Sequence, residues 1–546
     1  MNIRRFAMLS VVFFIAGLPV FSLGVDEEEL KSTGSNDSIV FVNYTGPHSK
    51  IDSLASIKKL GSDLGMVVAQ DLSKAASAGS AAKYSVIHAV DSSSTDKLDA
   101  DILLIGNDAT VDHINNLRHI IASYLVAAYG YTEKDAETVA VFVTVYNAVY
   151  RGKLDSYQDK YKPVVVNNLD SAKCGLALNY KEWAGKSQIV IPLFDVNGGL
   201  STVDTSVISD TEVVKKMQQD DDKNVEARKD MVEIKEREAE KATEKAQEAQ
   251  KTAIQEQKKL TEEKAKTETA KTEAEASKKE AEVAQKKADE NPEDKAAQAE
   301  AEEKKAVAEE KQKIYEEQKA AEEEQKEKTE EAKQEAATQQ ATADKKNNEA
   351  QEERKSIASD QQEVIEKEIK NAQAPSAYGI ELTDEKSMLS GLIKVNTQTG
   401  AIIKSSPVTF IRNRTIFQSA DGFVAIAGEN VKNGAVKLVL LSPDTMEIVK
   451  ESDEIVNENS VLVQDSGEYY CVVKNGSSWV LAKYGSDLSL KLKSSASLKS
   501  STPVTVADSF IIVTAANGSV CLLNKTDLSP VNGSPASSSS YNGSAK

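Results

Sequence analysis

Four groups of residues have types and spacings that suggest chemistry, and the first two would bind phosphate groups. Gly185, Lys186 and Ser187 match the end of a phosphate-binding loop, in which backbone N–H groups and a lysine hold phosphate oxygens. That loop also requires a glycine five residues before its second glycine. Tyr180 occupies this position, so we exclude a phosphate loop. Residues 105–110 form a strand-to-helix turn, but a single glycine does not make a dinucleotide fingerprint.

The other two groups contain histidines and carboxylates. His113 and His119 lie six residues apart on one predicted helix. Ligands on one helix face are spaced by three or four residues, so we do not expect a metal pair. Asp99, Asp101 and Asp108 flank a predicted strand, where we expect them to be solvated at the surface. The sequence therefore predicts no catalytic, cofactor-binding or metal-binding residue, and we expect that the protein is not an enzyme.

The elements around these residues predict a globular domain over residues 38–205. Strands are expected at 38–42, 84–90, 100–106, 163–166 and 189–194. Helices are expected over 54–72, over 114–128 and after the N-cap Thr132, with a loop over 73–82. Strands alternating with helices favour an α/β or α+β domain large enough for its own core. Because such domains often bind ligands at the carboxyl ends of strands, residues 106–110 are the place for an alternative small-ligand or enzyme function.

Residues 211–372 are almost wholly Ala, Glu, Lys, Gln and Thr, and most of these are strong helix formers. Pairs such as Glu262 and Lys266 place an acid four residues before a base, which supports a helix. An unbroken helix of this length would span roughly 240 Å. Larger apolar residues are too sparse for a continuous Leu/Ile seam. The segment is therefore a solvated single helix or a weak alanine-lined coil, which would allow homo-oligomers.

One break interrupts this helix, at residues 289–292. Asn291 is a good N-cap, and Pro292 suits the first position of a second helix. A hairpin at this point would bring the two end domains together, whereas a kink would keep them apart. The thin apolar seam favours the kinked rod.

The C-terminal part contains a repeated strand–turn–strand pattern. The repeats start at Leu392, Leu438, Val480 and Val520, with spacings of 46, 42 and 40 residues, and further strands lie between them. A period in the forties with four short strands favours a β-propeller-like domain over 375–530, with a β-sandwich or solenoid as the alternative. Four blades can close as one ring, or two copies can share a larger one. The serine-rich tail, 531–546, reads as disordered and favours the monomeric ring.

Residues 1–24 have the pattern of a signal peptide, with Arg4 and Arg5 before the apolar stretch 6–21. Cleavage is expected between Gly24 and Val25, and an uncleaved anchor is the alternative. Residues 25–37 form a polar leader. No later segment is long and apolar enough to span a membrane, so we expect an exported protein.

Composition restricts the partners and the redox chemistry. The formal net charge is −19, so nucleic acid is not an expected partner. Three cysteines are too few for a disulfide framework. Cys471 and Cys521 lie in strand-like runs, where we expect small core residues rather than a disulfide.

The order of these parts resembles the 83/100-kDa antigen family of spirochaetes. The resemblance covers the whole mature chain and is most specific at 38–44, Ser-Ile-Val-Phe-Val-Asn-Tyr, and at 57–65, Ile-Lys-Lys-Leu-Gly-Ser-Asp-Leu-Gly. It implies an immunogenic cell-envelope protein, and it supplies no catalytic residues. We therefore expect a periplasmic or peripheral envelope protein without cofactors. In this interpretation the rod spaces two binding modules, and the C-terminal repeats bind a protein or cell-wall partner.

Overall fold

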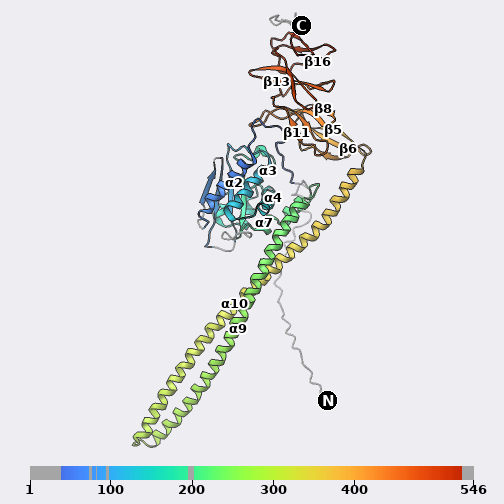
Figure 1. The fold of residues 1–546 in the computed structure, drawn as a ribbon. Coiled ribbons are helices and arrows are strands. Elements are labelled where there is room, and N and C mark those ends of the chain that lie inside the picture. Colours follow the sequence, from blue (N-terminus) through green and yellow to red (C-terminus); the bar gives the residue numbers. More distant parts are fainter. Residues whose placement is uncertain (1–38, 73–76, 82, 94–96, 195–201, 532–546) are drawn as a thin grey trace, which may run out of the picture. The chain divides into compact units, whose positions relative to one another are not determined.

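The structure, a computed structural model, describes residues 39–531 except 73–76, 82, 94–96 and 195–201 (Figure 1). The predicted signal peptide with its cleavage site at Gly24 and Val25, the polar leader and the tail from residue 532 lie outside the described residues. The described chain contains a mixed domain, a pair of very long helices and a set of antiparallel sheets. None of its helices combines the length and the apolar character that a membrane crossing requires.

The N-terminal domain is built on a four-stranded sheet in the order β1-β2-β3-β4. The strands are β1 Ser77–Ala81, β2 Tyr84–Ala89, β3 Asp99–Ile105 and β4 Gln188–Leu193. Every neighbouring pair in this sheet is antiparallel, so the domain is α+β and not α/β. All six residues of β4 are buried, as expected for a strand inside the core.

This domain has three longer helices, and the end of one and the start of another lie at signals that the sequence contains. They are α2 Leu54–Ala69, α3 Ile114–Tyr129 and α4 Glu133–Val149. Gly130 ends α3 in the left-handed conformation, and the Thr132 side chain caps α4 by accepting from the Asp135 N–H. The short helices that follow are α5 Leu154–Lys160, α6 Pro163–Val166, η1 Tyr180–Glu182, α7 Thr205–Ile208 and α8 Thr211–Met217.

Three predictions for this domain are wrong. Residues 163–166 form the helix α6, because Pro163 occupies a first-turn position where its missing N–H costs nothing. Of residues 38–42, only Val42 makes a bridge, to Asn179, so no strand forms in the described part of that segment. The predicted loop 73–82 contains β1, which pairs along its whole length with β2.

The long helices are α9 Val225–Glu290 and α10 Lys295–Gln373, and they run antiparallel, side by side (Figure 1). Polar contacts cross between them along their length. Gln250 donates to Gln340 at 2.9 Å, and Lys304 pairs with Glu280 at 2.7 Å. The prediction of a kinked rod is therefore wrong, and the segment is a hairpin.

The turn of the hairpin also differs in detail from the prediction. Asn291 is the C-cap of α9, and the N-cap of α10 is Asp294, whose carboxylate accepts from the N–H groups of Ala296 and Ala297. Pro292 lies between the two helices and not at a first helical position. Asp294 is the N-cap instead of Asn291 because its side chain reaches two free N–H groups of the first turn of α10.

Small residues line the seam between α9 and α10. On α10 a buried residue recurs every seven positions, as Thr329, Ala336, Ala343, Ala350 and Ile357. On α9 the buried residues include Ala239, Ala242, Ala246 and Ala253, at spacings of three, four and seven. Alanine lets two helices approach closely but buries little apolar area per residue. Of the two alternatives left open by the sequence, the alanine-lined seam is the one observed.

The C-terminal part contains three antiparallel sheets with seven, four and three strands. Because a single residue pair joins the two halves of the seven-stranded sheet, we count these halves as the first and second of four sheets in chain order. The first contains β5 Ser376–Asp384, β6 Leu389–Asn396 and β7 Ile402–Ser405, and the second contains β8 Ile411–Ser419, β9 Gly422–Ala427, β10 Lys437–Leu441 and β11 Ile448–Glu451. The third contains β12 Val463–Asp465, β13 Glu468–Asn475, β14 Ser478–Tyr484 and β15 Leu490–Lys493, and the fourth contains β16 Thr505–Val506, β17 Phe510–Thr514 and β18 Val520–Asn524. A single pair, Ser390 with Ile411, joins the first two.

Successive sheets pack face to face. One apolar cluster joins the first sheet to the second, another joins the second to the third, and another joins the third to the fourth. The hairpin turns repeat as well, since Met446, Leu488 and Leu528 are all buried with positive φ. Within the described chain the array stays open, because no strand pair and no apolar cluster joins the first sheet to the fourth. The predicted closed monomeric ring is therefore wrong.

Candidate functional site

The structure does not bring the histidines and the glycine of the sequence motifs into one site. His113 caps α3, with its Nδ1 accepting from the Asn115 N–H at 3.1 Å. The described residues contain no cluster of three or more His, Cys, Asp or Glu side chains that could hold a metal. Gly185 has a φ of 73°, and a Cβ there would lie 1.8 Å from Asn107 Oδ1. A close approach to Asn107 therefore accounts for this glycine.

The three aspartates of the sequence analysis have three different environments, and only Asp108 is exposed. Asp99 pairs with Lys162 at 2.8 Å. Asp101 is fully buried, so the prediction of surface solvation is wrong for it. Its Oδ2 accepts from the hydroxyls of Tyr124 and Tyr129, each at 2.5 Å.

The fourth member of the Asp101 cluster is His88, which is also fully buried. Its Nδ1 lies 2.6 Å from Asp101 Oδ1, and its Nε2 lies 3.1 Å from the carbonyl oxygen of Leu72. Since both neighbours are acceptors, the geometry suits an imidazolium that donates from both nitrogens. Burial alone would lower the pKa of His88, but the hydrogen bond and the charge of Asp101 raise it above 6.5.

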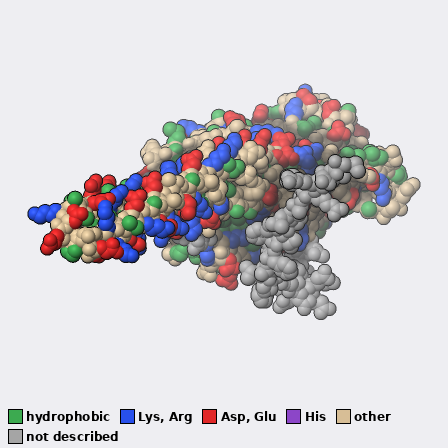
Figure 2. Space-filling model, turned by 90° about the horizontal axis from the view of Figure 1, so that it is seen from below, with side chains coloured by type: hydrophobic (Ala, Val, Ile, Leu, Met, Phe, Trp, Pro, Cys, Tyr) green, Lys and Arg blue, Asp and Glu red, His purple; other side chains and the backbone are tan. Residues whose placement is uncertain are grey.

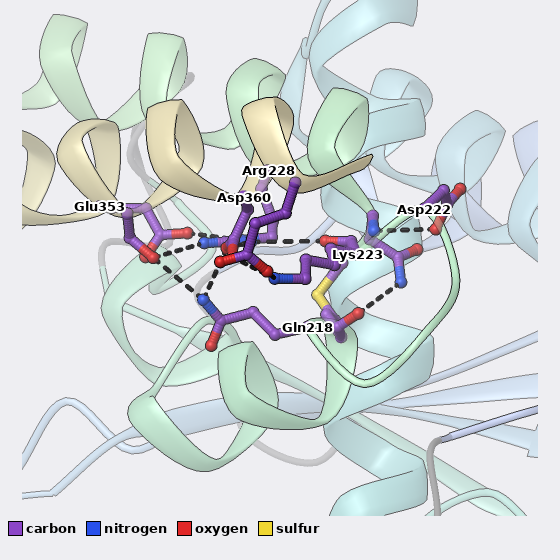
Figure 3. A network of polar contacts seen from close by, with 10 residues as sticks. Gln218, Asp222, Lys223, Arg228, Glu353 and Asp360 are labelled. Carbon is purple, nitrogen blue, oxygen red and sulfur yellow. Dashed lines mark hydrogen bonds and ion pairs between the residues drawn. The ribbon is translucent and has the colours of Figure 1, made fainter. Parts of the chain in front are cut away.

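An extensive polar network lies around Arg228 of α9, at the end of the helical hairpin opposite its turn, which we call its base (Figure 3). The Arg228 side chain is completely buried. Its Nε donates to Glu353 at 2.7 Å, its Nη1 donates to Asp360 at 2.6 Å, and its Nη2 donates to Ser356 at 3.0 Å. All three acceptors belong to α10, so one guanidinium joins the two helices.

Asp360 is shared between α9, α10 and the segment that precedes α9 (Figure 3). Lys223 donates to its Oδ1 at 2.9 Å, and Gln218 donates to its Oδ2 at 2.8 Å. Burial alone would raise the pKa of Asp360, but hydrogen bonds from Arg228, Lys223 and Gln218 lower it to about 2. Arg228, Glu353, Ser356 and Asp360, with Gln218 and Lys223, form what we call the base clamp.

Further ion pairs attach the base of the hairpin to the N-terminal domain. Lys134 of α4 pairs with Asp230 at 3.0 Å and with Glu233 at 2.9 Å. Arg237 pairs with Asp135, also on α4, at 2.5 Å. These contacts come from successive turns of α9, so the start of this helix lies along α4.

A buried carboxylate continues the network. Glu238 accepts from Thr205 at 2.8 Å and from Lys346 of α10 at 2.8 Å. The neighbouring Lys235 is also buried, and burial lowers its pKa below 10.5. The first turns of α9 thus carry charges into the seam, where each must have a partner.

The N-terminal domain also contacts the C-terminal sheets directly. The Tyr44 hydroxyl donates to the carbonyl oxygen of Pro47 at 2.8 Å and accepts from the Glu429 N–H at 3.2 Å. Its ring lies 5.0 Å from that of Phe410, and Thr45 donates to Pro407 at 2.6 Å. The hairpin therefore does not hold these two parts apart.

A pocket of about 320 Å³ lies next to the start of α3. Its apolar lining includes Ile57, Leu60 and Ile120. Charged and polar side chains also line it, and they include His48, Lys50, Asp52, Lys83, Asp112 and Asn116. His48 Nε2 lies 3.0 Å from Asp112 Oδ2. Thr110, the last residue of the turn at 105–110, also lines the pocket. The pocket can therefore admit a small molecule beside this turn.

Sequence reasoning missed the base clamp, although one signal for it was present. Arg228 and Lys235 occupy the same three–four stripe as Val225, Val232 and Ala239. A charged residue inside an apolar stripe requires a partner of opposite charge on the facing element. That signal predicts a pairing, but the partner lies more than a hundred residues away and cannot be chosen from the stripe alone.

Comparison with known proteins places the whole arrangement in a family. A model of the Borrelia P83/100 protein matches residues 27–504. The chain belongs to this family. The resemblance seen in the sequence is thereby confirmed, and the match extends over the N-terminal domain, the hairpin and the first three sheets of this P83/100 family member.

Other comparisons add little. No curated protein matches the chain. Among solved structures, BamB from Moraxella catarrhalis is 13% identical, with a TM-score of 0.16. That match covers 28% of this P83/100 family member and 62% of the BamB chain, so the chain spans less than two thirds of BamB. The base clamp and the pocket both lie inside the region that the family model matches.

Proposed function

We propose that this P83/100 family member is an exported interaction protein of the cell envelope, acting by binding and not by catalysis. The observation that carries the proposal is the long helical hairpin. In this hairpin the base clamp joins the start of α9 to the last turns of α10. Each helix is far longer than a domain core requires, and most of its residues face solvent. We expect a periplasmic or peripheral position in the envelope.

Because the long helices form a hairpin, they cannot space the two end domains as a kinked rod would. With 66 residues, α9 is about 100 Å long if straight, so the turn at Asn291 and Pro292 lies about that far from the base clamp. The hairpin of α9 and α10, which we call the arm, therefore holds its turn away from the N-terminal domain. Its surface offers charged side chains of both signs along this distance, and self-association as a coiled coil through the arm remains part of the proposal.

The distribution of charge favours a protein or a cell-wall polymer as the partner. Acidic and basic side chains are interspersed over the face that Figure 2 presents. With a formal net charge of −19, the chain lacks the basic excess that nucleic acids attract. In the proposal the C-terminal sheets, arranged like the blades of an open propeller, supply a second binding surface through their loops.

A matched deletion tests the role of the arm. Removing residues 260–280 and 305–325 takes three heptads from each helix and keeps the seam, the turn and the base clamp in register. We expect the shortened protein to fold normally and to bind isolated cell envelopes much more weakly than the full chain. Equal binding by the two proteins would count against the arm as the binding element.

The pocket beside α3 supports a second candidate function, the binding of a small molecule. The supporting observation is its mixed lining, with an apolar floor of Ile57, Leu60 and Ile120 beside Lys50 and Lys83. A screen of metabolites against the full chain should then find one that raises its melting temperature, and Ile120→Glu should abolish that rise. A screen without any hit would remove this candidate.

A further inference from the structure

The faces of the C-terminal sheets follow a simple rule within the array. Each sheet has a rear face toward the preceding sheet and a front face toward the next one. In the third sheet, Tyr470 and Leu481 lie on the front face and are completely buried against the fourth sheet. The residues that cover them are on the rear face of the fourth sheet, and they are Ile511, Val513, Cys521 and Leu523.

The front face of the fourth sheet also carries apolar side chains, but no described sheet covers it. Phe510 and Ile512 are 38% and 36% exposed, and Val520 is 63% exposed. The pairing of Val520 with Thr514 places it on the same face as the other two, since side chains alternate along β17. Phe510, Ile512 and Val520 form what we call the terminal front face.

The opposite end of the array is also open. Leu392 of β6 faces the second sheet, so Ile393 and Val395 face away from it. Ile402 pairs with Val395, and Gly379 pairs with Ile393. A Cβ added at Gly379 would meet nothing within 4 Å, and Ile402 is 51% exposed. Gly379, Ile393, Val395 and Ile402 form the terminal rear face.

We propose that the terminal front face of one chain docks on the terminal rear face of a second copy of the same chain. The partner is specified by the contact that the array already makes three times, in which the front face of one sheet meets the rear face of the next. The two open faces are complementary, because the front carries a phenylalanine and the rear carries a glycine opposite open space. Two copies related by a two-fold axis make this contact twice and leave no open face.

This inference concerns assembly and is independent of what the arm binds. The full chain, produced from Val25 onward, should sediment as a dimer at micromolar concentration. Ile512→Lys on the front face and Ile402→Lys on the rear face should each give a monomer with unchanged circular dichroism. The matched control is Val449→Lys on β11, because Val449 is 58% exposed but lies on neither terminal face. That variant should remain a dimer.

Mixing the two variants distinguishes this contact from other ways of forming a dimer. The Ile512→Lys chain keeps an intact rear face, and the Ile402→Lys chain keeps an intact front face. Their mixture should therefore form a heterodimer at concentrations where each variant alone is monomeric. A front-to-front dimer, or one formed through the helical arm, would survive Ile402→Lys and would overturn the proposal.

Two further results would also overturn it. One is a full chain that stays monomeric up to about 100 μM. The other is a monomer that becomes a dimer only when the chain is ended at Val531, because the tail would then be the occupant of an open face. Failure of the envelope-binding experiment with the shortened arm would leave this assembly unaffected.

Discussion

Arg228 and Asp360 lie 132 residues apart in the chain, yet the Nη1 of one donates to the Oδ2 of the other at 2.6 Å. The arginine is completely buried, and the aspartate is nearly so. This pair joins α9 to α10 at the base of the hairpin. Two helices joined by an alanine seam gain little from apolar burial, so paired charges at the base have a large share in fixing their register.

Replacing Arg228 by alanine should therefore destabilise the hairpin strongly. The change leaves the buried Asp360 without its main partner and removes the ion pair of Glu353. Removing one partner of a buried ion pair typically costs about 3–5 kcal/mol. Arg354→Ala is the matched control, because Arg354 also pairs across the hairpin, with Glu236, but is 60% exposed. It should cost less than about 1 kcal/mol. Urea denaturation followed by helical circular dichroism measures both, and equal losses would contradict the clamp.

The cluster of His88 and Asp101 should make stability depend on pH. The pKa of His88 is raised above 6.5 in the folded state by Asp101, against the effect of burial. Its protonation therefore adds stability that is fully present below pH 6.5 and is lost as the pH rises through the folded pKa. The unfolding free energy of the native protein, measured from pH 6 upward, should fall relative to that of His88→Asn.

His113 supplies a contrast within the same domain. Burial lowers the pKa of His113, so its protonation opposes folding below pH 6.5 and its effect has the opposite sign. For this reason the prediction concerns the difference between the native protein and His88→Asn, and not the whole curve. A difference that stays constant with pH would show that the His88 charge does not change in this range.

Overpacking the alanine seam should be costly. Ala343 is buried against Ala242 and Ala246, so Ala343→Phe has no space and should cost about 1–3 kcal/mol. Ala341→Phe places the same ring on an exposed position of the same turn of α10 and serves as the control. Thermal unfolding compares the two. Similar melting temperatures would mean that the helices do not touch at this level.

Local signals predicted much of the N-terminal domain. Thr132 and Gly130 marked helix ends through the hydrogen bonds of a cap and a left-handed residue, and these signals act within a few positions of the chain. The environment of Asp101 could not be predicted in this way. Its burial depends on His88 of β2 and on Tyr124 and Tyr129 of α3, which come from two other segments of the chain.

The hairpin could not be predicted for a related physical reason. Alanine is both the best helix former and the residue that lines the seam, so the same composition fits a solvated helix and a packed one. Position within the heptad distinguishes them, since Thr329, Ala336, Ala343, Ala350 and Ile357 share one stripe. Only Ile357 in that stripe is large, and the hydrophobic pattern is therefore weak.

Export leads to a prediction about the N-terminus. Residues 1–24 have the composition of a signal peptide, and no cysteine follows the apolar stretch to carry a lipid. Protein isolated from cells should begin at Val25, after cleavage at Gly24, and should have the mass of the unmodified chain. N-terminal sequencing with intact mass spectrometry checks this. Retention of Met1 or the added mass of acyl chains would exclude secretion by simple cleavage.

The hairpin itself is tested by a distance between two labels. Gln250 and Gln340 are in hydrogen-bond contact across α9 and α10, although 90 residues separate them. Spin labels on cysteines at these positions should lie within about 30 Å, whereas an unbroken helix would hold them about 135 Å apart. A second pair, at Gln250 and Asp289, lies on α9 alone and should give about 58 Å in either arrangement. The three natural cysteines are buried, which favours selective labelling of the introduced ones. Pulsed electron resonance that found the control distance but no short distance for Gln250 and Gln340 would refute the hairpin, and with it the clamp at Arg228.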